Sequence, residues 1–354
     1  MTDRNSGASE KPPETPMVRL KMADIARMAG VSVSSVSRAL AGSPLIPEAQ
    51  RDKINAIARE HGYVVNLAAR NLRLQTTQTI GLVLPMGHEK DQEISDPFLL
   101  ELIGGIADEV VKRGYDILLS KVTVTSEGWL RELTGSHRFD GLLVLGQSDQ
   151  HTTFNDMAAR YPGMVVWGEK LPDQAYCSVG VDNGMGGYLA TRHMIAGGCR
   201  DILFLGPSGT PESDARFRGY ARALATAPFR MGEAIDCETH FLYESGYEVV
   251  RDLIHQKHVF DGLFCASDMI AQGAMVALSE AGLRVPEDVA VCGFDDIAVA
   301  KSLSPALTTV SQDRKAGAKQ MVDLLFRRMA GKASEPVVMT PALVVRASTR
   351  PVQA

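Results

Sequence analysis

Short apolar runs alternate with amphipathic segments along the chain from residue 80 onward. The apolar runs fit buried strands, and the segments between them repeat apolar residues at helical spacing. This alternation predicts parallel sheets covered by helices on both faces. The expected strands are 80–84, 115–119, 141–145, 164–167, 178–181, 202–205, 262–265 and 289–294, and the expected helices lie near 98–113, 126–134, 152–160, 184–196, 214–226, 245–256, 268–281 and 315–330.

The number of strands is too large for one comfortable sheet. We therefore expect two similar lobes, with a division near Val179. Doubly wound sheets bind ligands beyond the carboxyl ends of their strands. Two facing lobes of this kind predict a cleft lined by the loops that follow the strands.

A different pattern precedes residue 80, where two short helical segments are separated by a tight turn. Ile25, Ala26 and Ala29 place small and apolar groups on one face of a first helix. Gly30 supplies the left-handed residue that ends this helix. The pattern predicts a helix-turn-helix, although an ordinary helical hairpin with a polar surface would share it.

The second helix of this pair is expected from Val33 to about Ala41, with Ser32 as its N-cap. Val36 and Leu40 would face inward. Small hydroxyls and one guanidinium then remain on the outer face, which suits a helix that enters a DNA major groove without bulk. These outer residues are Ser34, Ser35, Ser37 and Arg38.

A third helix is expected after the pair. Pro47 lies in its first turn, Ile54, Ile57 and Ala58 repeat at helical spacing, and Gly62 ends it. Residues 66–73 follow and are too short for a stable isolated helix.

Charge is distributed unevenly along the chain. The whole chain carries a net charge of -5, but residues 17–73 hold nine Lys and Arg against four Asp and Glu, which is a net +5. A basic module on an acidic body is the electrostatic signature of phosphate binding by one part of a modular protein. Chance clustering of basic residues on a helical surface would look the same.

Length and composition exclude several classes of protein. The 354 residues suffice for two or three domains, and 45% apolar with 22% charged residues is ordinary for a soluble globular protein. No apolar run reaches membrane-spanning length, and residues 1–16 lack the apolar core of a secretory signal, so we expect a cytoplasmic protein with a disordered tail. Its five scattered cysteines form no CxxC pair and argue against disulfides or a zinc site.

Motifs typical of enzymes are absent from the sequence. Residues 182–187 are glycine-rich but do not form GxGxxG, and no GxSxG, HExxH or P-loop occurs. The eight histidines show no metal-ligand spacing. We expect no catalytic residues, no metal and no cofactor, and a turnover assay would test this. A secreted sugar-binding transport protein is a further alternative, but it would not need residues 20–73.

Several motifs in order resemble the lactose repressor/galactose repressor (LacI/GalR) family of bacterial transcription regulators over about residues 20–350. Each motif is weak alone, and their joint spacing is specific. They are residues 29–32 and 36–40 (AGVS and VSRAL), 62–66 (GYVVN), 69–72 (ARNL), 216–220 (RFRGY), 281–289 (AGLRVPEDV), 293–296 (GFDD) and 305–310 (PALTTV).

The resemblance implies an α/β two-lobed periplasmic-binding-protein-like core with parallel doubly wound sheets and an all-α N-terminal helix-turn-helix headpiece. The chain would cross between the lobes near 179–182, 311–313 and 337–342. The expected divisions are a disordered tail (1–19), the headpiece (20–63), a hinge helix with linker (64–78), a first lobe (79–178 and 313–338) and a second lobe (179–312 and 339–350).

The resemblance also assigns DNA contacts in the headpiece. Val33 and Ser34 would read base edges from the first turn of the recognition helix, although Val33 could instead pack within the hairpin. Arg38 could contact guanine or phosphate. Ser32, Ser35 and Ser37 would orient the module on phosphates. The family often has Thr where this chain has Ser35.

The expected hinge residues that contact DNA are Asn66, Ala69, Arg70 and Leu72. The resemblance implies that Leu72 is an apolar wedge inserted between central base pairs in the minor groove, which kinks the duplex. Packing of Leu72 between hinge helix and core is the alternative.

For the cleft, the resemblance implies an effector site for a small molecule, most simply a neutral sugar. Carboxylates, amides and a guanidinium would bind the ring edge, and an aromatic side chain would cover its face. Arg216 and Asp295 could instead form a structural ion pair, and Phe241 could belong to the core. The family often has Asn at the position of Ser267. The residues implied are Pro97, Phe98, Asp182, Asn183, Arg216, Phe241, Asp268, Asp295 and Gln312.

The mechanism implied is a repressor of carbohydrate-utilisation genes, relieved by a sugar that changes the angle between the lobes. A homodimer would place two headpieces on a near-palindromic operator in double-stranded DNA, so the protein would be associated with the nucleoid. The chain ends without leucine heptads, which favours a dimer over a tetramer. A nucleobase, a phosphosugar or a partner protein as effector, or action with a corepressor, remains open. The expected cleft residues include Arg216 as their only cation and are less basic than a phosphate ligand would prefer.

Overall fold

The structure is a computed structural model, and it describes residues 20–63, 76–86, 94–124, 128–228 and 231–352. The predicted tail (1–19), most of the predicted hinge (64–75) and part of the expected helix near 126–134 therefore lie outside the described residues. The chain divides after Thr76 into two compact units, and each is described by itself.

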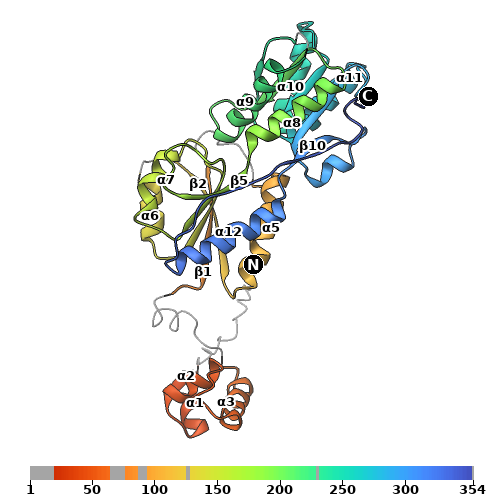
Figure 1. Cartoon of the computed structure of the whole chain (residues 1–354). Coiled ribbons are helices and arrows are strands. Elements are labelled where there is room, and N and C mark those ends of the chain that lie inside the picture. The colour runs from red at the N-terminus through yellow and green to blue at the C-terminus, as the bar shows by residue number, and fades with distance from the viewer. Residues whose placement is uncertain (1–19, 64–75, 87–93, 125–127, 229–230, 353–354) are drawn as a thin grey trace, which may run out of the picture. The chain divides into compact units, whose positions relative to one another are not determined.

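The N-terminal unit contains three helices, which are α1 (Met22–Ala29), α2 (Val33–Leu40) and α3 (Glu48–Glu60) (Figure 1). Ile25, Val36 and Ile54, one from each helix, have no exposed surface and form the centre of a small core. Gly30 has a φ of 71° and ends α1, and Gly62 follows α3 with a φ of 61°. The predicted three-helix arrangement is confirmed.

The first lobe of the larger unit is a six-stranded sheet in the order β11-β5-β4-β3-β1-β2, with every pair parallel. Leu82 and Leu84 face one side of this sheet and Val83 faces the other, as alternation along a strand requires. Its strands are β1 (Thr79–Met86), β2 (Asp116–Thr123), β3 (Gly141–Leu145), β4 (Met164–Trp167), β5 (Cys177–Val181) and β11 (Val337–Met339).

Helices cover both faces of this first sheet (Figure 1). One face packs against α5 (Pro97–Val111) and α12 (Arg314–Met329), and the other against α6 (Trp129–Gly135) and α7 (His151–Ala158). The two covered faces explain why these strands read as continuous apolar runs.

The second lobe repeats this architecture with the strand order β12-β10-β9-β8-β6-β7, in which only the β10–β12 pair is antiparallel among the described strands. Its strands are β6 (Ile202–Gly206), β7 (Asp236–Glu238), β8 (Gly262–Cys265), β9 (Ala290–Asp295), β10 (Thr308–Ser311) and β12 (Ala342–Val344). Its helices are α8 (Asn183–Ala196), α9 (Pro211–Ala225), α10 (Tyr243–His255), α11 (Asp268–Glu280) and the 3₁₀ turn η1 (Ala298–Lys301).

The chain passes between the lobes at three places. They follow β5, β10 and β11, because the next element in each case belongs to the other lobe. The sequence boundary at residue 179 is too early. Val179 and Val181 lie in β5, which pairs with β4 and β11 of the first sheet, and Met339 belongs to β11 of that sheet as well.

The hydrophobic pattern of the chain does not predict the strands β7, β10, β11 and β12. These strands have three or four residues each, and such short runs carry little periodic signal. β10 is nevertheless buried because it lies inside the second sheet between β9 and β12.

None of the helices in the described ranges is long and apolar enough to cross a membrane. All five cysteines are free thiols. Cys177, Cys199, Cys265 and Cys292 are buried, so they act as small apolar groups in the core.

Candidate effector pocket and nucleic-acid interface

The outer face of α2 presents the predicted DNA-contacting residues. The Ser32 hydroxyl accepts a hydrogen bond from the Ser35 backbone N–H at 3.1 Å, which confirms it as the N-cap. Val33 is 46% exposed, so it does not pack within the hairpin. Ser34 and Arg38 are also exposed, whereas Ser35 and Ser37 are half-buried. A solvated face of small side chains is what a groove-entering helix requires.

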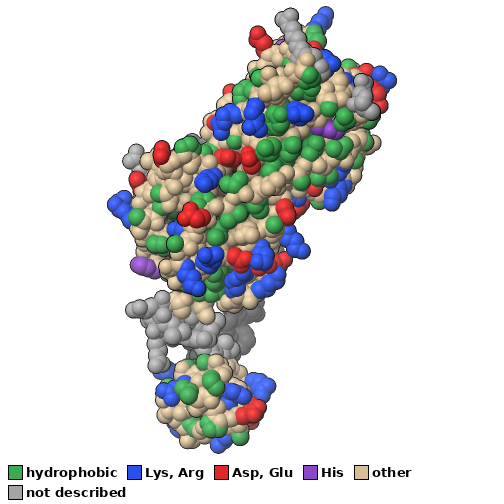
Figure 2. Space-filling view, viewed as in Figure 1, with side chains coloured by type: hydrophobic (Ala, Val, Ile, Leu, Met, Phe, Trp, Pro, Cys, Tyr) green, Lys and Arg blue, Asp and Glu red, His purple; other side chains and the backbone are tan. Residues whose placement is uncertain are grey.

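The hydroxyl of Ser32 is partly committed to its own helix. Its Oγ atom lies 2.8 Å from Ser34 Oγ and 2.9 Å from Ser35 Oγ, in addition to its capping bond. The predicted contact of Ser32 with phosphate stays a prediction. Lys and Arg side chains lie on the visible face of this N-terminal unit (Figure 2). The predicted hinge contacts Asn66, Ala69, Arg70 and Leu72 lie outside the described residues.

A pocket of about 800 Å³, including its open mouth, lies between the two lobes. Both lobes contribute residues from the carboxyl ends of their strands and from the helix starts that follow, as the topology predicts. The first lobe provides Leu84, Pro85, Asp96, Phe98, Leu99, Leu145, Gly146, Gln147, Ser148 and Trp167, and the second lobe with its crossing provides Thr210, Glu212, Arg216, Phe241, Ser267, Asp295 and Gln312.

Five of the predicted effector residues line this pocket, namely Phe98, Arg216, Phe241, Asp295 and Gln312. The other four are not among its lining residues. Pro97 is the first residue of α5, beside the lining residue Phe98. Asp182 is exposed and caps α8, where its side chain accepts a hydrogen bond from Met185 N at 2.8 Å. Asn183 and Asp268 lie behind the lining, where they hold other residues in place.

Arg216 enters the pocket from α9 with its guanidinium already fixed. Its Nε donates to Asn183 Oδ1 at 2.9 Å, its Nη1 donates to the Ala266 carbonyl, and its Cζ atom lies 3.8 Å from the centre of the Phe294 ring. Burial lowers the pKa of Arg216, and the field of Asp295 opposes that shift. These contacts orient the cation before any ligand arrives.

Asp295 ends β9 and presents its carboxyl group to the same pocket. Gln312 Nε2 donates to Asp295 Oδ1 at 2.5 Å. Burial raises the pKa of Asp295 to about 7, while Arg216 acts in the opposite direction. At neutral pH this carboxyl group can therefore donate or accept a hydrogen bond.

Asp268 is buried beside the carboxyl end of β9 and holds the backbone that follows this strand. Its Oδ1 accepts from Thr309 Oγ1 at 2.5 Å and its Oδ2 accepts from Ile297 N at 2.9 Å. Burial and the nearby Asp295 raise the pKa of Asp268 well above its ordinary value. Gly293 makes room for this carboxyl group, because a Cβ at that position would lie 2.2 Å from Asp268 Oδ1. Asp268 is thus placed as a supporting residue.

A chain of hydrogen bonds joins the two lobes at the back of the pocket. Gln147 Nε2 donates to the Glu169 carbonyl at 2.7 Å, and Asn183 Nδ2 donates to the Glu169 carboxyl group at 2.6 Å. Asn183 in turn accepts from Arg216. Burial raises the pKa of Glu169. Asn183 therefore connects the first lobe to the pocket cation.

Two buried polar atoms of lining residues have no hydrogen-bond partner within the described structure. They are Gln147 Oε1 from the first lobe and Thr210 Oγ1 from the second. Buried polar groups are normally paired, so an unpaired one at a pocket wall indicates a partner supplied by ligand or water. One such atom on each lobe suits a ligand that bridges them.

Most of the first-lobe residues that line the pocket were not predicted from the sequence. Gly146, Gln147 and Ser148 directly follow β3, and Trp167 ends β4, so the carboxyl-end rule for parallel sheets could have found them. Asp96 caps α5 through Phe98 N at 2.8 Å and Leu99 N at 3.1 Å. An Asp just before the predicted helix at 98–113 is a typical N-cap, so the sequence could have placed Asp96 at the start of this helix. Among the described residues no cluster of three or more His, Cys, Asp or Glu could hold a metal ion.

A helix-turn-helix unit joined in one chain to a two-lobed binding core defines a ligand-responsive DNA-binding transcription regulator. Residues 21–66 match the family described as "Bacterial regulatory proteins, lacI family", and residues 191–349 match the "Periplasmic binding protein-like domain". The chain belongs to the lacI family of bacterial regulatory proteins.

Relatives over nearly the whole chain are regulators of the same kind. The HTH-type transcriptional regulator CelR of Thermobifida fusca is 33% identical over 333 residues, which are 92% of this chain and 96% of CelR. The ribose operon repressor of Haemophilus influenzae is 30% identical, with 92% and 98% covered. The HTH-type transcriptional repressor PurR of Pasteurella multocida is 29% identical with the same coverage. These relatives are DNA-binding regulators and not enzymes.

Solved structures share the fold. A complex of the transcriptional regulator CelR with cellobiose has a TM-score of 0.68 and 31% identity, and covers 93% of this chain and 100% of that one. The Lac repressor dimer bound to operator and the anti-inducer ONPF has a TM-score of 0.82 and 24% identity, and covers 94% and 99%.

Proposed function

We propose that this protein is a repressor whose affinity for operator DNA is set by a neutral sugar bound between its lobes. The composition of the pocket wall is the observation that supports a sugar as the ligand. Phe98, Trp167 and Phe241 offer apolar faces for the C–H side of a sugar ring. Amides, hydroxyls and carboxyl groups surround them for the ring hydroxyls.

The charge of the wall argues against a phosphorylated ligand. Asp96, Glu212 and Asp295 bring three carboxyl groups, and Arg216 is the single Lys or Arg among the described lining residues. Two of the guanidinium nitrogens of Arg216 are already bonded to Asn183 and Ala266. A phosphate group would meet more acidic groups than free cationic donors.

A thermal-shift screen tests the ligand class on the full-length protein, because a ligand of the folded core stabilises it by mass action. The panel contains cellobiose, ribose and glucose, then glucose 6-phosphate, and then adenine and guanine. We expect a neutral sugar to raise the melting temperature and Asp295→Asn to reduce that rise. A rise in melting temperature with a nucleobase or phosphosugar alone would overturn the neutral sugar as ligand. It would not contradict the function as a ligand-responsive regulator.

On the DNA side, Val33, Ser34 and Arg38 are proposed to meet base edges, and Ser35 and Ser37 to meet phosphates. Ser32 mainly fixes the start of α2. Asn66, Ala69 and Arg70 are proposed to support a hinge segment whose Leu72 enters the minor groove. The relatives are HTH-type regulators, and one fold neighbour is a dimer on its operator.

We propose that the protein is a homodimer, whose two headpieces would bind the two halves of a near-palindromic operator. Its proposed location is the cytoplasm, at the nucleoid. Selection of bound duplexes from a random library tests this reading. We expect enrichment of a near-palindrome, and enrichment of no sequence would overturn it.

A further inference from the structure

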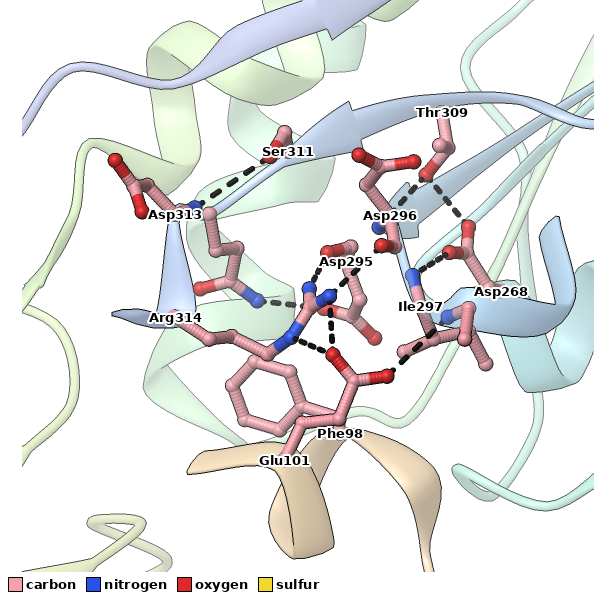
Figure 3. A network of polar contacts seen from close by, with 12 residues as sticks. Phe98, Glu101, Asp268, Asp295, Asp296, Ile297, Thr309, Ser311, Asp313 and Arg314 are labelled. Carbon is pink, nitrogen blue, oxygen red and sulfur yellow. Dashed lines mark hydrogen bonds and ion pairs between the residues drawn. The ribbon is translucent and has the colours of Figure 1, made fainter. Parts of the chain in front are cut away.

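A polar network joins the lobes beside the pocket (Figure 3). Glu101 of α5 and Arg314 of α12 come from the first-lobe side, and residues 295–298 come from the second lobe. Arg314 Nε and Nη2 donate to Glu101 Oε2 at 3.0 and 2.7 Å. Its Nη1 donates to the Asp295 carbonyl and its Nη2 donates to the Asp296 carbonyl at 2.8 Å. Glu101 Oε1 accepts from Ala298 N at 3.2 Å.

The stability of α12 does not explain the position of Arg314. Arg314 is the first residue of that helix, where the positive end of the helix dipole disfavours a cation, and no acidic residue lies in the first turn. The side chain is nevertheless only 13% exposed. Its bonds to Glu101 and to two carbonyl groups offset this unfavourable placement.

The segment that Arg314 holds is rigidly fixed to the second lobe. Asp268 binds Ile297 N, and Arg346 forms an ion pair with Asp296. Asp295 and Asp296 have φ values of 113° and 54°, in the region that residues with a Cβ rarely adopt. Strained backbone persists where the surrounding contacts hold it, and such sites cluster in switch regions. A force on this segment is therefore carried to the whole lobe.

The second-lobe segment 295–298 and helix α5, which the network joins, also contribute residues to the pocket. The carboxyl group of Asp295 lines it, while the carbonyl of the same residue binds Arg314. Phe98 also lines it and lies one helical turn before Glu101 on α5. A ligand that moves Asp295 or Phe98 changes the geometry at Arg314 directly.

We infer that Glu101 and Arg314 form an interlobe clasp on residues 295–298, and that this clasp biases the arrangement of the lobes which determines operator affinity. This role of the clasp rests on the proposed function, and it names two residues that regulate operator affinity. It makes Glu101 and Arg314 positioning residues, since they act through Asp295 and the lobe angle. Because a two-state equilibrium responds to any change in the relative stability of its states, clasp variants shift operator affinity before any effector is added.

The test uses full-length protein without effector and the duplex selected by the wild type, with fluorescence anisotropy as the readout. Glu101→Gln and Arg314→Gln each remove a charged partner of the clasp. Both are expected to change the operator Kd in the same direction, by about threefold to tenfold for a lost charged hydrogen bond. The double variant is expected to change it no more than the larger single change, because both groups act as one unit.

The matched control is Arg113→Gln. Arg113 lies just beyond the end of α5 and forms an ion pair with Asp323 of α12. No described hydrogen bond joins this pair to the second lobe. We expect wild-type operator affinity from this variant. Arg314→Lys retains one cation, so its change is expected to be smaller than that of Arg314→Gln.

Thermal unfolding of each variant separates loss of fold from loss of the clasp, and Arg314→Lys replaces Arg314→Gln in the cycle if the latter does not fold. Wild-type operator affinity in both folded single variants, or additive effects in the double variant, would overturn the clasp. The proposed function as a DNA-binding regulator would not be affected by that result. Failure of the wild type to select any duplex would instead overturn the proposed function.

Discussion

Single residues at this site are fixed before they meet a ligand. Arg216 is oriented by an amide, a carbonyl and an aromatic ring, and Asp268 is enclosed by the backbone and hydroxyl groups that it supports. Such preorganisation reduces the side-chain conformational entropy that the protein loses when a ligand binds. The predictions at this scale therefore concern single side chains to which one role is assigned.

Ser32→Ala removes the N-cap of α2. We expect the free energy of opening of α2 to fall by about 1 kcal/mol, which is the usual value of such a cap. Hydrogen exchange of the α2 amides in the full-length protein measures it. Ser34→Ala is the control, since the described bonds of the Ser34 side chain reach only Ser32 Oγ. An equal loss of protection in both variants would contradict the capping role.

Asp295→Asn tests the effect of burial on a carboxyl group. The folded pKa of about 7 lies above the ordinary value of 3.8, so the folded state retains a proton that the unfolded state has lost. The free energy of unfolding of the core should therefore fall as pH rises from about 4 to about 7, and the variant should lose this part of the slope.

Denaturant titrations across that pH range measure the slope. Arg216, Arg314, Asp96 and Asp268 face the Asp295 carboxyl group. Asp268 retains its own contribution in the variant because burial raises its pKa as well. An unchanged slope in Asp295→Asn would show that Asp295 ionises normally.

Leu72→Ala tests the proposed wedge. Loss of the apolar side chain should weaken specific operator binding by about tenfold, as removal of an intercalating group reduces the contact that offsets unstacking. Effector binding in the core should be unchanged. Anisotropy with operator and thermal shift with the effector check both halves, and unchanged operator affinity would remove the wedge.

At the scale of elements, helices α8 and α9 must approach closely because they carry Asn183 and Arg216. A Cβ at Gly219 would lie 2.0 Å from the Gly184 carbonyl oxygen, and one at Gly187 would lie 2.2 Å from the Arg216 carbonyl oxygen. Backbone atoms cannot move aside as a flexible side chain can. The glycines therefore determine the distance between the two helices and with it the bond between Arg216 and Asn183.

Gly219→Ala should destabilise the core by about 3 kcal/mol, because the added methyl group forces the helices apart. Gly104→Ala is a matched control in another helix, since a Cβ at that exposed position meets nothing within 4 Å among the described atoms. It should be neutral or stabilise by up to about 1 kcal/mol through helix propensity. Chemical denaturation compares them, and equal stability of the two variants would contradict the close packing.

At the scale of the whole molecule, regulation is a coupling between two binding events. If the effector changes operator affinity by a given factor, operator must change effector affinity by the same factor. We expect a factor of about 5 to 150, the usual range for allosteric coupling. Calorimetric titration of effector with and without operator measures one side and anisotropy the other. Equal effector affinity in both titrations would contradict coupling.

The sequence by itself determined the local elements and the order of the lobes. Ser32 and Gly30 define the turn between α1 and α2 through capping and left-handed backbone, which depend on neighbouring residues alone. The long apolar runs identified eight strands because buried parallel strands are apolar on both faces. Motifs at fixed spacing contain Arg216 and Asp295, and the resemblance to the family that these motifs carry added Gln312 as a pocket residue.

The tertiary structure decided which residues meet across the chain. Gln147, Glu169 and Asn183 join in one chain of hydrogen bonds, and Glu101 meets Arg314, although their positions in sequence are far apart. It also showed that Asp182 and Asp268 serve as cap and support, and that β5 belongs to the first sheet. Local patterns cannot encode these pairings, because they arise only where the two lobes pack against each other and bury the groups at their boundary.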